Sequence, residues 1–164
     1  MALITLKGTP IHTNGDIPSV GSTAPDFSLV AGDLSEASLA TYAGKKKVLN
    51  IFPSIDTGIC ALSVRRFNAD AAGRDDTVVL NISADLPFAQ GRFCGAEGIE
   101  DAVSLSAFRS SFAQDYNLEI IDGPLAGLAS RVVLVLAADN TVLHAEQVPE
   151  IAQEPDYATA LAAL

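Results

Sequence analysis

The chain has 164 residues, of which 49% are hydrophobic and 18% are charged, a composition typical of a folded globule and not of a disordered chain. Its 20 acidic and 10 basic residues give a formal net charge of −10, which disfavours binding to nucleic acids and to anionic membranes. No apolar run approaches the roughly 18 residues of a membrane-spanning helix, and polar residues interrupt the N-terminal stretch where a signal peptide needs an apolar core. We therefore expect a cytoplasmic protein.

The length predicts that residues 1–164 form a single domain. The two cysteines, Cys60 and Cys94, allow one disulfide, and in a reducing compartment such a pair is more often catalytic or redox-sensing than structural. Together with His12 and His144 they show none of the paired spacing of a zinc site. We expect neither a metal nor a cofactor.

The first third of the chain predicts mainly β structure. Residues 2–6 and 11–13 are extended types separated by turn residues, which predicts an N-terminal β-hairpin. Residues 26–30 alternate between apolar and other side chains, which predicts a strand. Residues 38–44 could form a short helix or a turn.

A strand, a helix and a second strand follow. Residues 48–52 form an apolar run typical of a buried strand, entered from a basic turn at 45–47. A helical pattern extends from residue 59 to about 72 and closes at Gly73, and residues 77–82 predict the second buried strand. The two strands should be parallel with a right-handed crossover, because they are joined by a helix.

The second half completes an α/β pattern. Pro87 and Gly95 bound a predicted short helix, and residues 105–116 have the spacing of an amphipathic helix. The remaining predicted elements are a turn at 122–124, a hairpin of strands 131–137 and 141–147, and a helix at 157–164. Periodicity alone thus supports a sheet flanked by helices.

Cys60 lies at the junction between the strand 48–52 and the helix that follows. Pro53 ends the strand because it cannot donate to a sheet ladder. Asp56 and Thr57 are good N-cap types, so Cys60 falls in the first helical turn, near unpaired N–H groups and the positive end of the helix dipole. That setting favours the nucleophilic thiolate. The alternative is that Cys60 is a small apolar core residue, as most free cysteines are.

Pro53, Thr57 and Cys60 stand in the pattern Pro-x-x-x-Thr-x-x-Cys. The pattern resembles the peroxidatic-cysteine motif of the peroxiredoxins, and the full stretch Pro-Ser-Ile-Asp-Thr-Gly-Ile-Cys is similar to that of the bacterial thiol peroxidase subfamily. The segment 83–95, which ends in Arg-Phe-Cys-Gly, resembles the resolving-cysteine region of the same proteins, and Gly-Leu-Ala-Ser-Arg at 127–131 resembles the segment with the active-site arginine.

The resemblance implies a thioredoxin-like fold with a central mixed sheet and an atypical two-cysteine peroxidase. Cys60 would be the peroxidatic residue and Cys94 the resolving one, joined within one chain as a disulfide. It also implies hydrogen peroxide and organic hydroperoxides as substrates, thioredoxin as the reductant, and a homodimer.

Reduction of a peroxide by a thiol needs a thiolate, positive groups around it and a means of recycling the sulfenic acid. Thr57 can place a hydroxyl beside Cys60 because residues i and i+3 share a helical face, and Pro53 would shield the intermediate. Arg131 begins an apolar strand and would stabilise the thiolate and polarise the peroxide. The alternative is that Arg131 caps the strand in solvent. Arg65 and Arg66 are expected on the exposed helix face.

The same cysteines are also compatible with roles other than peroxide reduction. A thioredoxin-like disulfide reductase would need Cys-x-x-Cys, and Thr57 stands where the first cysteine would be. Cys94 could instead be a second buried structural cysteine. A non-catalytic redox sensor or holdase would use the same Cys60–Cys94 switch, and only peroxide turnover separates it from an enzyme.

Overall fold

The computed structural model describes residues 1–71, 73–99 and 102–164. The predicted N-terminal hairpin is present, because β1 (Leu3–Leu6) pairs antiparallel with β2 (Thr9–His12). Residue 72, at the end of the predicted first helix, lies outside the described residues. None of the helices in the described ranges is long and apolar enough to cross a membrane.

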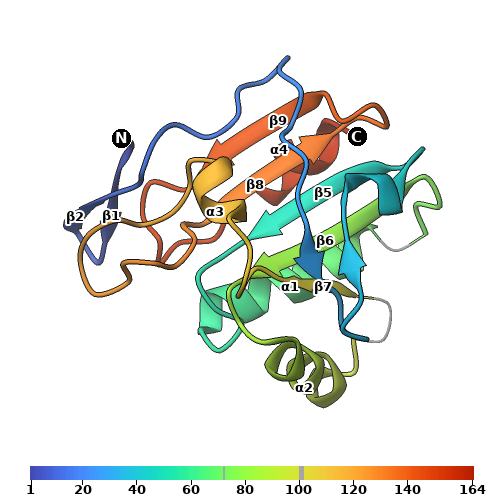
Figure 1. Ribbon diagram of the computed structural model, residues 1–164, viewed down its shortest axis with the longest axis horizontal. Coiled ribbons are helices and arrows are strands. Elements are labelled where there is room, and N and C mark those ends of the chain that lie inside the picture. Colours follow the sequence, from blue (N-terminus) through green and yellow to red (C-terminus); the bar gives the residue numbers. More distant parts are fainter. Residues whose placement is uncertain (72, 100–101) are drawn as a thin grey trace.

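A seven-stranded mixed sheet forms the centre of the molecule (Figure 1). Its strands, in chain order, are β3 (Leu29–Val30), β4 (Glu36–Ala37), β5 (Lys46–Ile51), β6 (Thr77–Ser83), β7 (Val103–Ser106), β8 (Val132–Leu136) and β9 (Val142–Gln147). Their spatial order is β4-β3-β7-β6-β5-β8-β9. β5, β6 and β7 are mutually parallel, as the strand-helix-strand pattern predicts for β5 and β6, and the other pairs are antiparallel.

Helices cover both faces of this sheet. α1 (Gly58–Ala71) and α4 (Tyr157–Ala162) share one face, where Phe67 and Tyr157 meet edge to face with ring centroids 5.0 Å apart. The 3₁₀ helix η1 (Leu39–Tyr42) and α3 (Phe112–Asp115) contribute to the other face. α2 (Pro87–Glu97) lies beside β7.

β5 is buried on both sides, which explains why its sequence from Val48 to Ile51 is apolar except at Asn50. Successive side chains of a strand point to opposite faces. Val48 accordingly packs with the α1 and α4 cluster, and Leu49 and Ile51 pack with the opposite cluster around Phe112. Full burial of each such side chain contributes about 1.5–3 kcal/mol, so the middle of the sheet is the most strongly anchored part of the fold.

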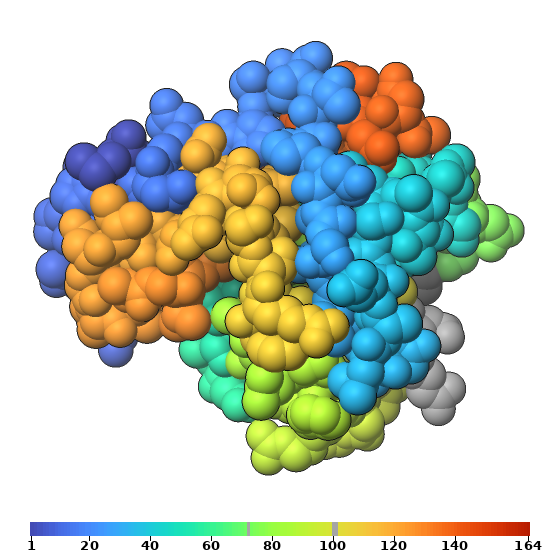
Figure 2. Space-filling model, in the orientation of Figure 1, coloured from blue at the N-terminus to red at the C-terminus, as the bar shows by residue number. Residues whose placement is uncertain are grey.

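Figure 2 shows how the second face is closed. The segment that leads into β3 and the segment that follows β7 lie side by side across the surface. Phe27 and Phe112, one from each segment, make an edge contact with ring centroids 5.7 Å apart. Two largely irregular segments therefore help the short helices η1 and α3 to cover this face of the sheet.

The helix predicted for residues 105–116 is wrong over most of its length. Its first residues belong to β7, where Leu105 lies opposite Ile82 of β6 and is fully buried. Helix forms only in α3, from Phe112 to Asp115. The apolar spacing is that of a helix, but the parallel ladder with β6 satisfies the backbone of residues 103–106 and determines its conformation.

Three further boundaries differ from the prediction. Lys46 and Lys47 belong to β5 and not to a turn, and the ammonium of the buried Lys47 donates to Lys45 O at 3.0 Å and to Asn140 Oδ1 at 2.8 Å. Burial lowers the pKa of Lys47. Gly95 lies inside α2, which ends at Glu97 and is capped by Gly98 with a left-handed φ of 68°. The strand predicted at residues 26–30 is reduced to β3.

Candidate active site

Cys60 is the third residue of α1 and is fully buried. The helix begins at Gly58, directly after Thr57, and the Ala61 N–H donates to Thr57 O at 3.0 Å, which places Thr57 at the helix start as its sequence predicts. Cys60 is thus held in the first turn, where backbone N–H groups lack helical partners and the helix dipole is positive.

Arg131 contacts the sulfur of Cys60. It directly precedes β8, and because β8 runs antiparallel to β5, with Val132 opposite Ile51, Arg131 lies beside the loop that follows β5. Its Nη2 donates to Cys60 Sγ at 3.2 Å, and its Nε donates to Ile151 O at 2.9 Å. The side chain is 2% exposed, which rules out the alternative of a strand cap in solvent.

The guanidinium of Arg131 keeps one nitrogen without a partner. Its Nη1 is buried and has no hydrogen bond to any described part of the chain. A buried donor left unpaired costs free energy, so this N–H is available to an oxygen atom brought to the site. The sulfur contact and the free donor belong to the same planar group.

Pro53 and Thr57 lie at the same cavity as Arg131. Pro53 is buried at the end of β5, and Thr57 is exposed. The hydroxyl of Thr57 donates to Ser54 O at 3.1 Å, and not to the sulfur of Cys60 as the helical spacing had suggested. Its oxygen remains able to accept a hydrogen bond from a molecule in the cavity.

The cavity measures about 500 Å³ and its walls are mainly apolar. Cys60 does not line it, but its sulfur contacts the Arg131 guanidinium, which does. The lining residues come from the hairpin, the loop before α1 and the loops around β8: Leu6, Lys7, Pro53, Ser54, Thr57, Gly58, Ile59, Leu125, Leu128, Arg131, Ile151 and Ala152.

A buried polar network supports the first turn of α1. Ser63 Oγ donates to Cys60 O at 2.8 Å, and Asn50 Nδ2 donates to Ser63 Oγ at 3.2 Å and to Asn81 Oδ1 at 3.0 Å. Sequence reasoning missed this network. The available signal was that Asn50 and Asn81 interrupt two apolar strands, and the structure places them opposite each other in the β5–β6 ladder.

Cys94 lies in α2 and is half-buried. Its sulfur is 3.7 Å from Ser104 Oγ, and both cysteines are free thiols. The neighbouring Phe93 packs against the apolar cluster that contains Cys60. The structure therefore brings Arg131 to Cys60 and holds Cys94 on an adjacent helix without bonding it to Cys60.

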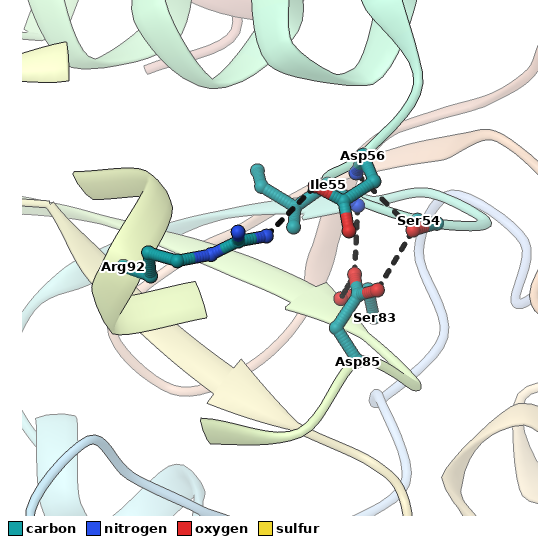
Figure 3. A network of polar contacts seen from close by, with 6 residues as sticks. All are labelled: Ser54, Ile55, Asp56, Ser83, Asp85 and Arg92. Atoms are coloured by element: carbon teal, nitrogen blue, oxygen red, sulfur yellow. Dashed lines mark hydrogen bonds and ion pairs between the residues drawn. The ribbon is translucent and has the colours of Figure 1, made fainter. Parts of the chain in front are cut away.

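Asp85 is the second group that sequence reasoning missed. It follows β6, and its carboxylate accepts three hydrogen bonds (Figure 3): from Ser54 Oγ at 2.7 Å, from the Ile55 N–H at 2.7 Å and from Ser83 Oγ at 2.6 Å. Asp56 in the same loop also forms an ion pair with Arg92 of α2 at 3.7 Å. The only sequence signal was a carboxylate placed just after a buried strand.

No group of three His, Cys, Asp or Glu side chains in the described ranges is placed to hold a metal ion. His12 Nδ1 contacts Asp122 Oδ2 at 2.7 Å, and this side-chain contact, followed by the hydrogen bond from the His12 backbone N–H, lowers the pKa of Asp122. Arg65 and Arg66 lie on the exposed side of α1, as predicted.

Comparison with known proteins matches residues 19–161 to the Redoxin family. The thiol peroxidases of Mycobacterium tuberculosis strain H37Rv and of Mycobacterium bovis are each 56% identical over 164 residues, covering 100% of this chain and 99% of theirs. A peroxiredoxin-like protein from Aquifex aeolicus has a similar structure, with a TM-score of 0.93 and 32% identity over 99% of this chain and 96% of that one.

A thiol peroxidase from Chromobacterium violaceum superposes with a TM-score of 0.90 over 98% of this chain and 93% of that one, and at 21% identity it supports the fold alone. The fold is therefore thioredoxin-like, as the resemblance implied. The chain belongs to the Redoxin family and, within it, to the peroxiredoxins of the thiol peroxidase type, which are oxidoreductases.

Proposed function

We propose that this protein is a thioredoxin-dependent thiol peroxidase that reduces hydrogen peroxide and organic hydroperoxides through a sulfenic acid on Cys60. The observation that carries the proposal is the 3.2 Å contact between Arg131 Nη2 and Cys60 Sγ at an apolar cavity. A buried guanidinium beside a thiol at a helix N-terminus stabilises the thiolate, which is the reactive form.

In the first step the Cys60 thiolate attacks the terminal oxygen of the hydroperoxide. A sulfur–oxygen bond forms, the oxygen–oxygen bond breaks, and Cys60 becomes a sulfenic acid while the peroxide takes two electrons. The leaving alkoxide accepts a proton and departs as an alcohol, or as water from hydrogen peroxide. The unpaired Nη1 of Arg131 would stabilise the developing negative charge, and Thr57 would accept a hydrogen bond from the peroxide.

In the second step the Cys94 thiol attacks the sulfenic sulfur. The disulfide forms within one chain, and the hydroxyl leaves with the thiol proton as water. An external dithiol, thioredoxin, then restores both thiols by exchange and is itself oxidised to a disulfide. Pro53, buried beside the loop, would shield the sulfenic acid from water.

The remaining features of the proposal rest on family membership and composition. Residues 1–164 would act as one thioredoxin-like domain, since the alignment with the mycobacterial relatives spans all of them. The protein would work in the cytoplasm, in keeping with its two cysteines and its acidic composition. That it would work as a homodimer rests on the family resemblance alone.

The decisive experiment is mass spectrometry of the reduced protein after one equivalent of cumene hydroperoxide. We expect rapid loss of two hydrogens, mapped by digestion to a Cys60–Cys94 link within one chain, and repeated turnover when thioredoxin and its reductase are added. An added oxygen on Cys60 without that link would show that a thiol other than Cys94 resolves the sulfenic acid. One oxidation event without turnover would favour a redox sensor, and no change at all would refute the peroxidase.

A further inference from the structure

We propose that Asp85 is a positioning residue that couples the Cys60 loop to the helix carrying Cys94, and so sets how the sulfenic acid divides between disulfide formation and further oxidation. This inference rests on the function proposed above. It assigns no contact between Asp85 and the reacting atoms.

The Asp85 carboxylate holds the loop before α1 to the end of β6. Its Oδ1 accepts from Ser54 Oγ, and its Oδ2 accepts from both the Ile55 N–H and Ser83 Oγ (Figure 3). Hydrogen bonds to an ionised acceptor are about twice as strong as neutral ones. Four residues from two segments, 54–55 and 83–85, are thereby joined at one carboxylate.

The same loop positions Thr57. Both the N–H and the hydroxyl of Thr57 donate to Ser54 O, at 3.3 Å and 3.1 Å. Because Asp85 holds Ser54 through its side chain, a change at Asp85 reaches Thr57, which directly precedes α1 and lines the cavity. Loss of the carboxylate is therefore expected to disturb the approach of the peroxide.

The connection continues from Asp85 into α2. Ser83 Oγ, which donates to Asp85, accepts from Gln90 Nε2 at 3.1 Å, and the same amide nitrogen is 3.1 Å from Leu105 O. Gln90 is 3% exposed, and it and Pro87 are the two buried residues of α2. A helix with so little buried apolar surface depends on such polar anchors, and it opens at low free-energy cost when they weaken.

Disulfide formation requires the two thiols to come together, and we place this movement in α2. The thiol of Cys94 is directed at Ser104 Oγ and both cysteines are free, whereas a disulfide needs the two sulfurs about 2 Å apart. A shift of α2 would break the hydrogen bond from Gln90 to Ser83. The ion pair of Arg92 with Asp56 also crosses this boundary, but both side chains are largely exposed and such pairs contribute little.

Two fates compete for the sulfenic acid once it has formed. Attack by Cys94 gives the disulfide, and attack on a second peroxide gives the sulfinic acid, so the peroxide concentration that yields half sulfinic acid reports the ratio of the two rates. If Asp85 restrains α2 through Ser83 and Gln90, weakening this restraint makes disulfide formation faster. It does not make the reaction with a second peroxide faster.

The test is Asp85→Asn, which keeps the shape of the side chain but leaves one oxygen to accept from three donors. We expect disulfide formation to become about tenfold faster, on the scale of a lost hydrogen bond to a charged group, while sulfenic acid formation becomes slower. The half-sulfinate peroxide concentration should rise by at least the same factor, because the disturbed approach of the peroxide also slows the second oxidation. Both steps are followed by rapid quenching and mass spectrometry.

Asp139→Asn is the matched control. Asp139 also accepts a backbone N–H, from Thr141 at 3.0 Å, but it lies beyond Leu136, at the opposite end of β8 from Arg131. Asp139→Asn should leave the rates of sulfenic acid formation and of disulfide formation unchanged. A residue with a merely structural role would lower the unfolding midpoint without moving the two rates in opposite directions, and that result in Asp85→Asn would overturn the proposal.

Ser83→Ala provides a second test should Asp85→Asn not fold. It removes the hydroxyl between Asp85 and Gln90 but leaves the contacts of Asp85 with Ser54 and Ile55. We expect faster disulfide formation with unchanged sulfenic acid formation, and an unchanged ratio would refute the coupling. Failure of the proposed function looks different, because the native chain would then form no sulfenic acid on Cys60.

Discussion

The two cysteines occupy regions built in opposite ways. Cys60 is fully buried at the start of α1, with Arg131 on its sulfur and Ser63 on its carbonyl. Cys94 is half-buried on α2, where its sulfur makes a long polar contact with Ser104 Oγ. One thiol is surrounded by groups that fix its geometry, and the other is on an element that few contacts restrain.

This difference matches what the two proposed steps require. A step that depends on charge stabilisation gains from donors already in position, because they need no reorganisation during the reaction. A step that depends on bringing two sulfurs together needs one element to open at low cost. The following changes would sharpen or break the contrast between a preorganised Cys60 and a movable Cys94.

Cys60→Ser should have the largest effect, a complete loss of peroxide reduction. A serine hydroxyl keeps the size of the side chain but is not ionised at neutral pH and cannot form a sulfenic acid. The measurement is consumption of cumene hydroperoxide, with a thermal unfolding curve to show that the variant folds. Residual turnover above the blank would place the peroxidatic group elsewhere.

Cys94→Ser should separate the two steps. The first turnover should proceed at the native rate, because Arg131 and Thr57 are untouched, but the sulfenic acid should persist and turnover with thioredoxin should stop after one equivalent of peroxide. A coupled assay with thioredoxin reductase measures this burst. Sustained native turnover would show that Cys94 does not resolve the sulfenic acid.

Arg131→Met should slow sulfenic acid formation by about 10²–10³-fold, the usual effect of losing one preorganised donor at a developing oxyanion. The methionine fills part of the same space without a charge. Arg66→Met on the exposed side of α1 is the control and should leave the rate unchanged. Equal rates in native protein and Arg131→Met would remove the electrostatic role.

The smallest contrast concerns stability and compares the two helices directly. Phe67 of α1 is fully buried against Tyr157, and Phe88 of α2 is 69% exposed. Phe67→Ala should lower the free energy of unfolding by about 3–5 kcal/mol, and Phe88→Ala should change it by less than about 0.5 kcal/mol. Urea denaturation measures both, and similar losses would mean that α2 is as firmly packed as α1.

Local sequence patterns predicted those parts of the fold whose partners are close in the chain. The N-terminal hairpin, the β5–α1–β6 unit and the β8–β9 hairpin follow from alternation, turn residues and helix-start signals. The same signals located Cys60 in the first turn of α1. In each case the hydrogen bonds that define the element are made within it or to the next one.

Prediction failed where distant segments decide the conformation. Residues 103–106 form a strand because β6 offers a parallel ladder. The ammonium of the buried Lys47 donates a hydrogen bond to Asn140, 93 residues away. No local pattern encodes either contact. The Asn50–Asn81 pair and the three donors to Asp85 were missed for the same reason.

The sequence by itself determined the motif of the proposed reactive centre: a cysteine three residues after a threonine at a strand-to-helix junction, with an arginine and a second cysteine further along. Only the tertiary structure decided that Arg131, 71 residues from Cys60, is buried against its sulfur, and that Asp85 joins the Cys60 loop to the segment leading into α2. Helix starts depend on neighbouring residues, whereas a charge reaches a thiol so distant in the chain only when antiparallel pairing of β8 with β5 brings the two together.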